Sequence, residues 1–134
     1  MVDSSAQPGQ RRSPQREAIQ RVIERAAGPL TVRQIHARAK RRITNLGIAT
    51  VYRNINLLLE ADRIRTVTLS DGESRYESAG LGHHHHFKCR VCRKVYDLPG
   101  CQLANSVDTR LPEGFVAEEH EVTFHGTCPD CSAK

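Results

Sequence analysis

The first half of the chain repeats its apolar residues every three or four positions, which is the spacing of amphipathic helices. Three helices are predicted: one from Pro14 to the Gly28-Pro29 break, one that Thr31 caps, and one that begins after Asn45. Their expected inward-facing residues are Ile19, Val22, Ile23 and Ala26, then Val32, Ile35 and Ala39, then Ile48, Val51, Ile55 and Leu58. The opposite face of the third helix carries Ala49, Tyr52, Arg53 and Asn56.

In residues 63–78 the pattern changes to period two, and polar and apolar residues alternate on both sides of Asp71-Gly72. This predicts a β-hairpin with a two-residue type I′ turn, in which both central residues take positive φ. Three short helices followed by a hairpin describe a winged helix. The polar face of the third helix, with Tyr52, Arg53 and Asn56, then offers groups that reach DNA bases and phosphates.

Shorter elements are expected in the second half. The predicted domains are a flexible basic arm at 1–13, a winged-helix DNA-binding domain at 14–78, a hinge (AGLG) at 79–82, and a metal-binding domain at 83–134. The last domain is expected to hold strands at 83–88, around 95–98 and within 116–125, and a helix near 101–110 with Leu103, Val107 and Leu111 inward. The fold class is therefore α+β.

Charge and composition divide the chain in the same way. Residues 1–78 hold 14 Lys and Arg against 8 Asp and Glu, whereas residues 79–134 hold 6 against 7. The basic half indicates an anionic partner, the alternative being an ordinary solvated basic surface. With no apolar run of membrane-span length and no signal-peptide core, a cytoplasmic location without a membrane partner is expected. The scarcity of aromatic residues disfavours a large pocket for a small-molecule substrate.

Five cysteines in a chain without a secretory signal point to metal or redox chemistry. Four of them form the pairs Cys89-x-x-Cys92 and Cys128-x-x-Cys131, separated by 35 residues. Two such pairs complete the closed tetrahedral sphere that structural Zn²⁺ prefers. The alternative is a pair of redox dithiols, although redox catalysis normally needs one pair in a thioredoxin-like frame.

The four consecutive histidines at 83–86 would alternate between the two faces of a strand, so that each face receives two ligands of a different site. The expected sets are Glu77 with His84 and His86 across the hinge, and Cys101 and His120 with His83 and His85. Simpler interpretations stay open: Glu77 as a surface carboxylate and Cys101 as a small buried thiol. His36 and His125 are expected to be structural.

Four segments together resemble the ferric uptake regulator family of bacterial metal-dependent repressors: ATVYRNINLLLEA (49–61), SRYE (74–77), HHHHFKCRVC (83–92) and GFVAEEHEVTFHGTCPDC (114–131). The resemblance spans nearly the whole chain from Pro14. It implies a homodimer rather than an enzyme, with an N-terminal winged-helix domain that binds a palindromic operator in double-stranded DNA and a C-terminal α/β dimerisation domain.

The resemblance also implies site residues. The recognition helix corresponds to Thr50–Arg53, with Tyr52 contacting bases and Arg53 contacting phosphates. The structural zinc corresponds to Cys89, Cys92, Cys128 and Cys131, the hinge site to Glu77, His84 and His86, and the dimerisation-domain site to His83, His85 and His120. Arg11, Arg12 and Arg16 are expected to add phosphate contacts that are independent of sequence.

Three departures from the family pattern bear on the regulatory metal. Pro29 stands where many members have a hinge-site histidine, His85 replaces the aspartate of HHDH, and residues 102–107 contain no acid, which leaves Cys101 as the substitute ligand. Thiolate and imidazole suit zinc, so these departures favour the zinc uptake regulator branch over an Fe²⁺, Mn²⁺ or peroxide sensor. Alternatives from other classes are a zinc storage or delivery protein, a zinc hydrolase and a dithiol oxidoreductase.

Overall fold

The computed structural model describes residues 13–101 and 111–133, and the chain divides into two compact units, residues 1–80 and 81–134. The boundary between the units falls inside the 79–82 segment. Arg11, Arg12 and the helix expected near 101–110 lie outside the described residues, apart from Cys101 and Leu111. In the described part, no helix is both long and apolar enough to cross a membrane.

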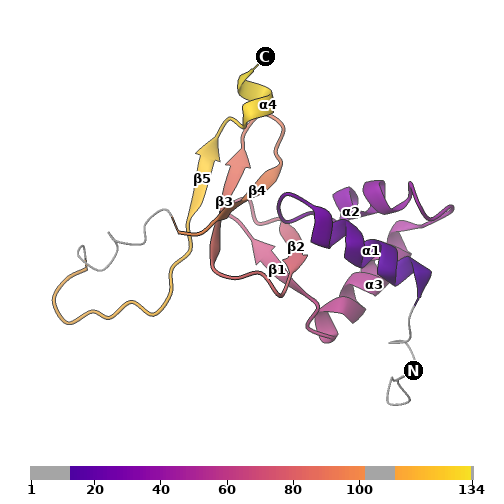
Figure 1. Cartoon of the computed structure of the whole chain (residues 1–134), viewed down its shortest axis with the longest axis horizontal. Coiled ribbons are helices and arrows are strands. Elements are labelled where there is room, and N and C mark those ends of the chain that lie inside the picture. Colours follow the sequence, from indigo (N-terminus) through magenta and orange to yellow (C-terminus); the bar gives the residue numbers. More distant parts are fainter. Residues whose placement is uncertain (1–12, 102–110, 134) are drawn as a thin grey trace. The chain divides into compact units, whose positions relative to one another are not determined.

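Three helices and a hairpin build the first unit (Figure 1). The helices are α1 (Pro14–Arg25), α2 (Val32–Ala39) and α3 (Ile48–Glu60), followed by β1 (Ile64–Thr68) and β2 (Ser74–Ser78). The Ser13 hydroxyl accepts the Arg16 backbone N–H at the start of α1, and Thr31 and Gln34 form a reciprocal capping box at the start of α2. The expected helix starts are therefore set by local side-chain caps.

A single apolar core holds the first unit together. Its buried members are Ile19, Ile23, Leu30, Val32, Ile35, Ala39, Leu46, Val51, Ile55, Leu58 and Ile64. One expected core position is wrong: Ile48, in the first turn of α3, is 42% exposed. Asn54 is buried instead, and its Nδ2 donates to the Thr50 carbonyl at 2.9 Å, which satisfies its polar group inside the helix.

The hairpin forms as expected, but its turn is longer than the expected two residues and is of a different type. Residues Ile64↔Ser78 to Thr68↔Ser74 pair antiparallel, so the connection is residues 69–73 rather than two residues. Only Gly72 of the Asp71-Gly72 pair has positive φ (75°), which excludes type I′. The reason is the Asp71 carboxylate, which accepts the Glu73 backbone N–H and the Arg75 guanidinium and so fixes a wider loop.

A three-stranded sheet forms the second unit, with β3 (His84–Cys89) between β4 (Val95–Pro99) and β5 (Thr123–Gly126) (Figure 1). β4 pairs antiparallel with β3, and β5 pairs parallel. The last strand is shorter than expected, so His120 precedes it in an irregular segment. A short helix, α4 (Pro129–Ser132), follows β5 and was not predicted.

The second unit has little apolar interior. Of its described residues, only Cys89, Val95 and Cys128 are buried hydrophobics, and none belongs to the core cluster of the first unit. So small a core does not normally support a fold alone, and metal ions or disulfides usually supply the missing stability. None of the five cysteines forms a disulfide, and all five belong to candidate metal clusters.

Candidate metal centres and DNA-binding helix

The four cysteines of the two CxxC pairs converge at one end of the sheet. Cys89 ends β3, and Cys92 follows in the turn, while Cys128 caps α4 and Cys131 lies within it. Parallel pairing of Cys89 with Gly126 places the two pairs next to each other. All four Sγ atoms lie within 4.8 Å of one another, which is a donor set that matches a closed structural Zn²⁺ site.

Backbone amides and burial give these thiols different acidities. Cys89 Sγ accepts the backbone N–H groups of Cys92 at 3.5 Å and Cys128 at 3.4 Å, and these contacts, chiefly that from Cys92, lower the pKa of Cys89 to about 6. A hydrogen bond from the Tyr96 hydroxyl lowers the pKa of Cys128. Burial, together with the neighbouring thiols, raises the pKa of Cys131 to about 12. The fold thus stabilises thiolate at part of the cluster, as metal ligation requires.

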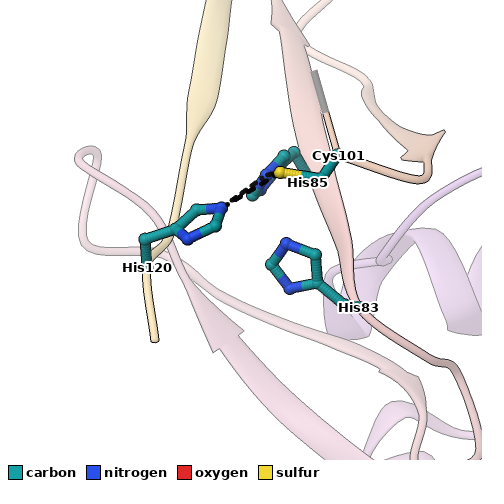
Figure 2. A group of neighbouring side chains, drawn as sticks. All are labelled: His83, His85, Cys101 and His120. Carbon is teal, nitrogen blue, oxygen red and sulfur yellow. Dashed lines mark hydrogen bonds between the residues drawn. The ribbon is translucent and has the colours of Figure 1, made fainter. Parts of the chain in front are cut away.

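A second cluster joins His83, His85, Cys101 and His120, whose ligand atoms also lie within 4.8 Å of one another. Figure 2 shows the three imidazoles and the thiol pointing toward a common centre. Cys101 Sγ lies 3.3 Å from Nε2 of His85 and 3.2 Å from Nε2 of His120. The sequence-predicted set is therefore assembled in the structure, including Cys101.

The histidine nitrogens of this cluster are suited to a cation. Burial, and then the neighbouring histidines, lowers the pKa of His85, which favours the neutral imidazole that binds metals. Nε2 of His85 and Nε2 of His120 are 3.2 Å apart, so either one neutral ring donates its N–H to the other or both lone pairs can bind one metal ion. Three imidazoles and one thiolate make a four-ligand set without any carboxylate.

On the other face of β3, His84 and His86 meet Asp97 of β4. Nε2 of each histidine lies 3.4 Å from Asp97 Oδ1. Nδ1 of His84 is 2.7 Å from the Gly82 carbonyl, which can only accept, so Nδ1 is the donor and the neutral ring carries its lone pair on Nε2, where a metal would bind. The alternation expected along the histidine run is thus seen in the structure.

Asp97 is a candidate ligand that sequence reasoning missed. It stands opposite His86 in the antiparallel register of β3 and β4. The sequence does show an aspartate among the apolar residues of Val95–Pro99. Its closeness to His84 and His86, however, depends on a strand register that the sequence did not reveal.

Glu77 lies in the first unit, on β2, and it is not a surface carboxylate. Only 3% of Glu77 is exposed, and its Oε2 accepts Nε of Arg65 at 2.6 Å. The simpler interpretation is wrong for this residue, because a buried carboxylate needs charged partners to offset its desolvation. Its participation with His84 and His86 stays a prediction.

Of the two histidines expected to be structural, His36 makes a structural side-chain contact and His125 does not make one that the structure describes. Nε2 of His36 lies 2.7 Å from the Leu46 carbonyl and ties α2 to the segment before α3. His125 is exposed on β5 and belongs to none of the described metal clusters.

The outer face of α3 presents the predicted DNA-contacting residues. Tyr52 is 52% exposed, Arg53 and Asn56 are exposed, and Thr50 is half-buried. Val51, Ile55 and Leu58 anchor the opposite face in the core, so the helix is held rigidly while its polar side chains are available to a ligand. Arg16 lies in the first turn of α1.

Comparison with known proteins bears on what this arrangement does. The model of the ferric uptake regulator family matches residues 7–125. The ferric uptake regulation protein of Bacillus subtilis (strain 168) is 34% identical over 128 residues, which cover 91% of this chain and 85% of that protein. Among solved structures, a zinc-bound manganese uptake regulator is similar with a TM-score of 0.79 at 26% identity, over 90% of this chain and 92% of the other.

A further solved structure, the Helicobacter pylori ferric uptake regulator, is described as having three functional metal binding sites. It is similar with a TM-score of 0.68 at 26% identity, over 93% of this chain and 84% of the other. The family model and the Bacillus relative each cover most of the chain, and the winged-helix and metal-binding parts agree with this similarity. The chain is therefore a member of the ferric uptake regulator family, whose members are metal-responsive, DNA-binding transcriptional regulators and not enzymes.

Proposed function

We propose that this regulator is a zinc-responsive repressor of metal-uptake genes, which acts on DNA in the cytoplasm. The observation that carries the proposal is the thiol of Cys101, whose Sγ lies 3.3 Å and 3.2 Å from the Nε2 atoms of His85 and His120. Thiolate and imidazole donors favour Zn²⁺, whereas Fe²⁺ and Mn²⁺ sites are richer in carboxylate and water. The cluster with His83 therefore supports zinc as the ion that is sensed.

The four-cysteine cluster would hold a structural rather than a regulatory zinc. Its ligand set is closed, and Cys89 and Cys128 are buried, so the ion would exchange slowly and would stabilise the small second unit. A sensor needs a site that fills and empties over the physiological range of the metal, which the histidine clusters are better placed to provide.

Coupling to DNA is proposed to act through the 79–82 segment. In the sequence, Glu77 precedes this segment and His84 follows it, so ligation by Glu77, His84 and His86, with Asp97, would restrict the angle between the two units. A restricted angle favours a spacing of two recognition helices that matches successive major grooves, about 34 Å apart. A coupling of roughly 1–3 kcal/mol changes DNA affinity about 5- to 150-fold, which is enough for a switch.

A homodimer on a palindromic operator supplies the second recognition helix. In the second unit, Phe115 and Val116 are 67% and 87% exposed, as expected of apolar residues that a partner covers. A two-fold dimer brings the Tyr52 faces of two α3 helices to two half-sites.

A second candidate, iron or manganese sensing, is favoured by Asp97. Its carboxylate beside His84 and His86 is a harder donor than the Cys101 thiol, and Glu77 would add another. The similarity to a ferric uptake regulation protein and to a manganese uptake regulator fits the same alternative.

The test is capture of fragmented genomic DNA by the purified full chain in parallel buffers that clamp free Zn²⁺, Fe²⁺ or Mn²⁺, beside a chelated sample. Selective capture of discrete promoters with zinc alone is the expected result. Selection with iron or manganese alone would overturn the choice of metal. The absence of selective capture in every metal buffer would instead favour a storage role. His83→Ala should weaken the zinc response, while His125→Ala, an exposed histidine outside the clusters, is the matched control.

A further inference from the structure

A basic groove lies in the first unit, and none of its lining residues has so far been assigned to DNA. Its volume is about 500 Å³, and it runs between α1 and the chain at the end of α2. Its apolar lining residues are Ala18, Val22 and Ile43. Five arginines line it: Arg21, Arg25, Arg38, Arg41 and Arg42. We call it the arginine groove.

Backbone hydrogen bonds fix the positions of the main-chain segments that carry these arginines. Arg21 and Arg25 are four residues apart on α1 and therefore share one helix face. Arg38 is in the last turn of α2, and the next turn is closed by the Arg42 N–H to the Ala39 carbonyl at 3.0 Å. Ala39 is fully buried, so the turn that carries Arg41 and Arg42 is anchored in the core.

The positive charge of the arginine groove is not neutralised within the part of the chain that the structure describes. One carboxylate, Glu17, lines the groove, and none of the five arginines takes part in a described salt bridge. Two arginines elsewhere in the same unit are paired, Arg65 with Glu77 and Arg75 with Asp71. The five arginines of the groove therefore remain available to an anionic ligand.

Guanidinium groups around a concave surface select phosphate. The planar fork of arginine donates two parallel N–H bonds to phosphate oxygens, and binding relieves the mutual repulsion of the arginines. The N-terminal arm is a poor occupant, because it carries Arg11 and Arg12 and would add to the positive charge. DNA, the ligand of this family, presents one negative charge per roughly 1.7 Å of duplex.

We propose that the arginine groove binds the phosphodiester backbone of DNA, independently of base sequence, in addition to the contacts expected from α3. Such contacts orient the protein on the duplex and strengthen binding to every sequence equally. The inference rests on DNA binding by the family and not on which metal is sensed.

The test compares full-length, zinc-loaded protein with a variant that carries Arg21→Gln, Arg25→Gln, Arg41→Gln and Arg42→Gln. Fluorescence anisotropy would follow binding to a captured promoter duplex and to an unrelated duplex, from about 50 to 300 mM KCl. The slope of log affinity against log salt is expected to fall by roughly 0.9 for each phosphate that the variant no longer neutralises. Both affinities should fall by the same factor, on the order of tenfold or more at about 150 mM salt.

The control is Arg90→Gln with Lys94→Gln, which removes two positive charges at exposed positions of the second unit and should leave the slope unchanged. An unchanged slope in the groove variant, or an equal decrease in the control, would overturn the proposal. So would a rise in Tm with inorganic tripolyphosphate at an unchanged slope, because the groove would then bind a small phosphate ligand.

Two checks keep the result interpretable. Far-ultraviolet circular dichroism verifies the fold, and Arg41→Gln alone, with an expected slope change of roughly 0.9, replaces the fourfold variant if the latter is unfolded. The ratio of affinities with and without zinc should persist in the groove variant. If zinc does not change the DNA affinity of the wild-type protein, the proposed zinc response is wrong. The proposal for the arginine groove does not depend on that result.

Discussion

Cys101 is the side chain that distinguishes the two histidine clusters chemically, because it supplies the sulfur that the His84–His86 cluster lacks. With zinc already in the four-cysteine cluster, added Co²⁺ should give a near-ultraviolet sulfur-to-cobalt absorption band that Cys101→Ser removes. His83→Ala should retain the band, because the thiolate remains. Zinc affinity of Cys101→Ser should fall at least about tenfold, or about 1.4 kcal/mol. A band that persists in Cys101→Ser would show that this thiol is not a ligand.

Tyr52 and Arg53 are adjacent on the exposed face of α3. Their substitution by alanine is expected to weaken DNA binding in two different ways. Tyr52→Ala should cost about 1–3 kcal/mol on the preferred operator and relax its sequence preference, because the alanine no longer reaches a base. Arg53→Ala should weaken binding to all sequences and reduce the salt slope by about 1.

Titrations of the operator and of an unrelated duplex separate the two outcomes. Glu60→Gln, at the exposed end of the same helix, is the control for a general effect on α3. Unchanged operator affinity in Arg53→Ala would remove that residue from the interface.

At the scale of elements, α2 depends on its capping box. The Thr31 hydroxyl accepts the Gln34 N–H at 3.2 Å, and the Gln34 side chain accepts the Thr31 N–H at 2.9 Å. Thr31→Ala should lower the free energy of unfolding of the first unit by about 0.5–2 kcal/mol, measured by urea denaturation. Thr44→Ala, at an exposed position between α2 and α3, should have almost no effect. If Thr31→Ala and Thr44→Ala unfold at the same urea concentration, the capping box does not contribute to stability.

The elements that were predicted well are those fixed by neighbours in sequence. The start of α1 at Pro14, the cap at Thr31 and the period of α3 are local, and so is the alternation of His83 to His86. The turn at Asp71 was predicted wrongly because a side-chain ion pair, with Arg75, decided its shape. Propensity rules for turns do not include such a pair.

Predictions failed most where distant segments meet. The parallel pairing of β5 with β3 joins residues more than thirty positions apart, and it sets both the short strand and the irregular position of His120. Asp97 was missed for the same reason, because its closeness to His84 and His86 follows from the register of β4. The candidate ligands on β3 were thus predictable, whereas Asp97 depended on the register of a neighbouring strand.

For the whole molecule, the two units are expected to depend on metal unequally. The first has an eleven-residue apolar cluster, whereas the second has three buried hydrophobics in its described part, two of them cysteines of the metal cluster. Removing zinc with a strong chelator should therefore unfold residues 81–134 and leave 13–80 folded. Hydrogen exchange read by mass spectrometry would show fast exchange in β3 to β5 and protection in α1 to α3. Equal loss of protection in both units would contradict this.

The histidine run sends alternate imidazoles to opposite faces of β3, so two ligand clusters share one stretch of backbone. An ion that holds His83 and His85 in place also restricts the backbone that carries His84 and His86. By thermodynamic reciprocity, filling either cluster must then change the affinity of the other by the same factor. If that factor exceeds one, gene expression would respond to metal concentration over a narrower range than a single site permits, and the sharpness of the threshold would originate in the two-residue repeat of a β-strand.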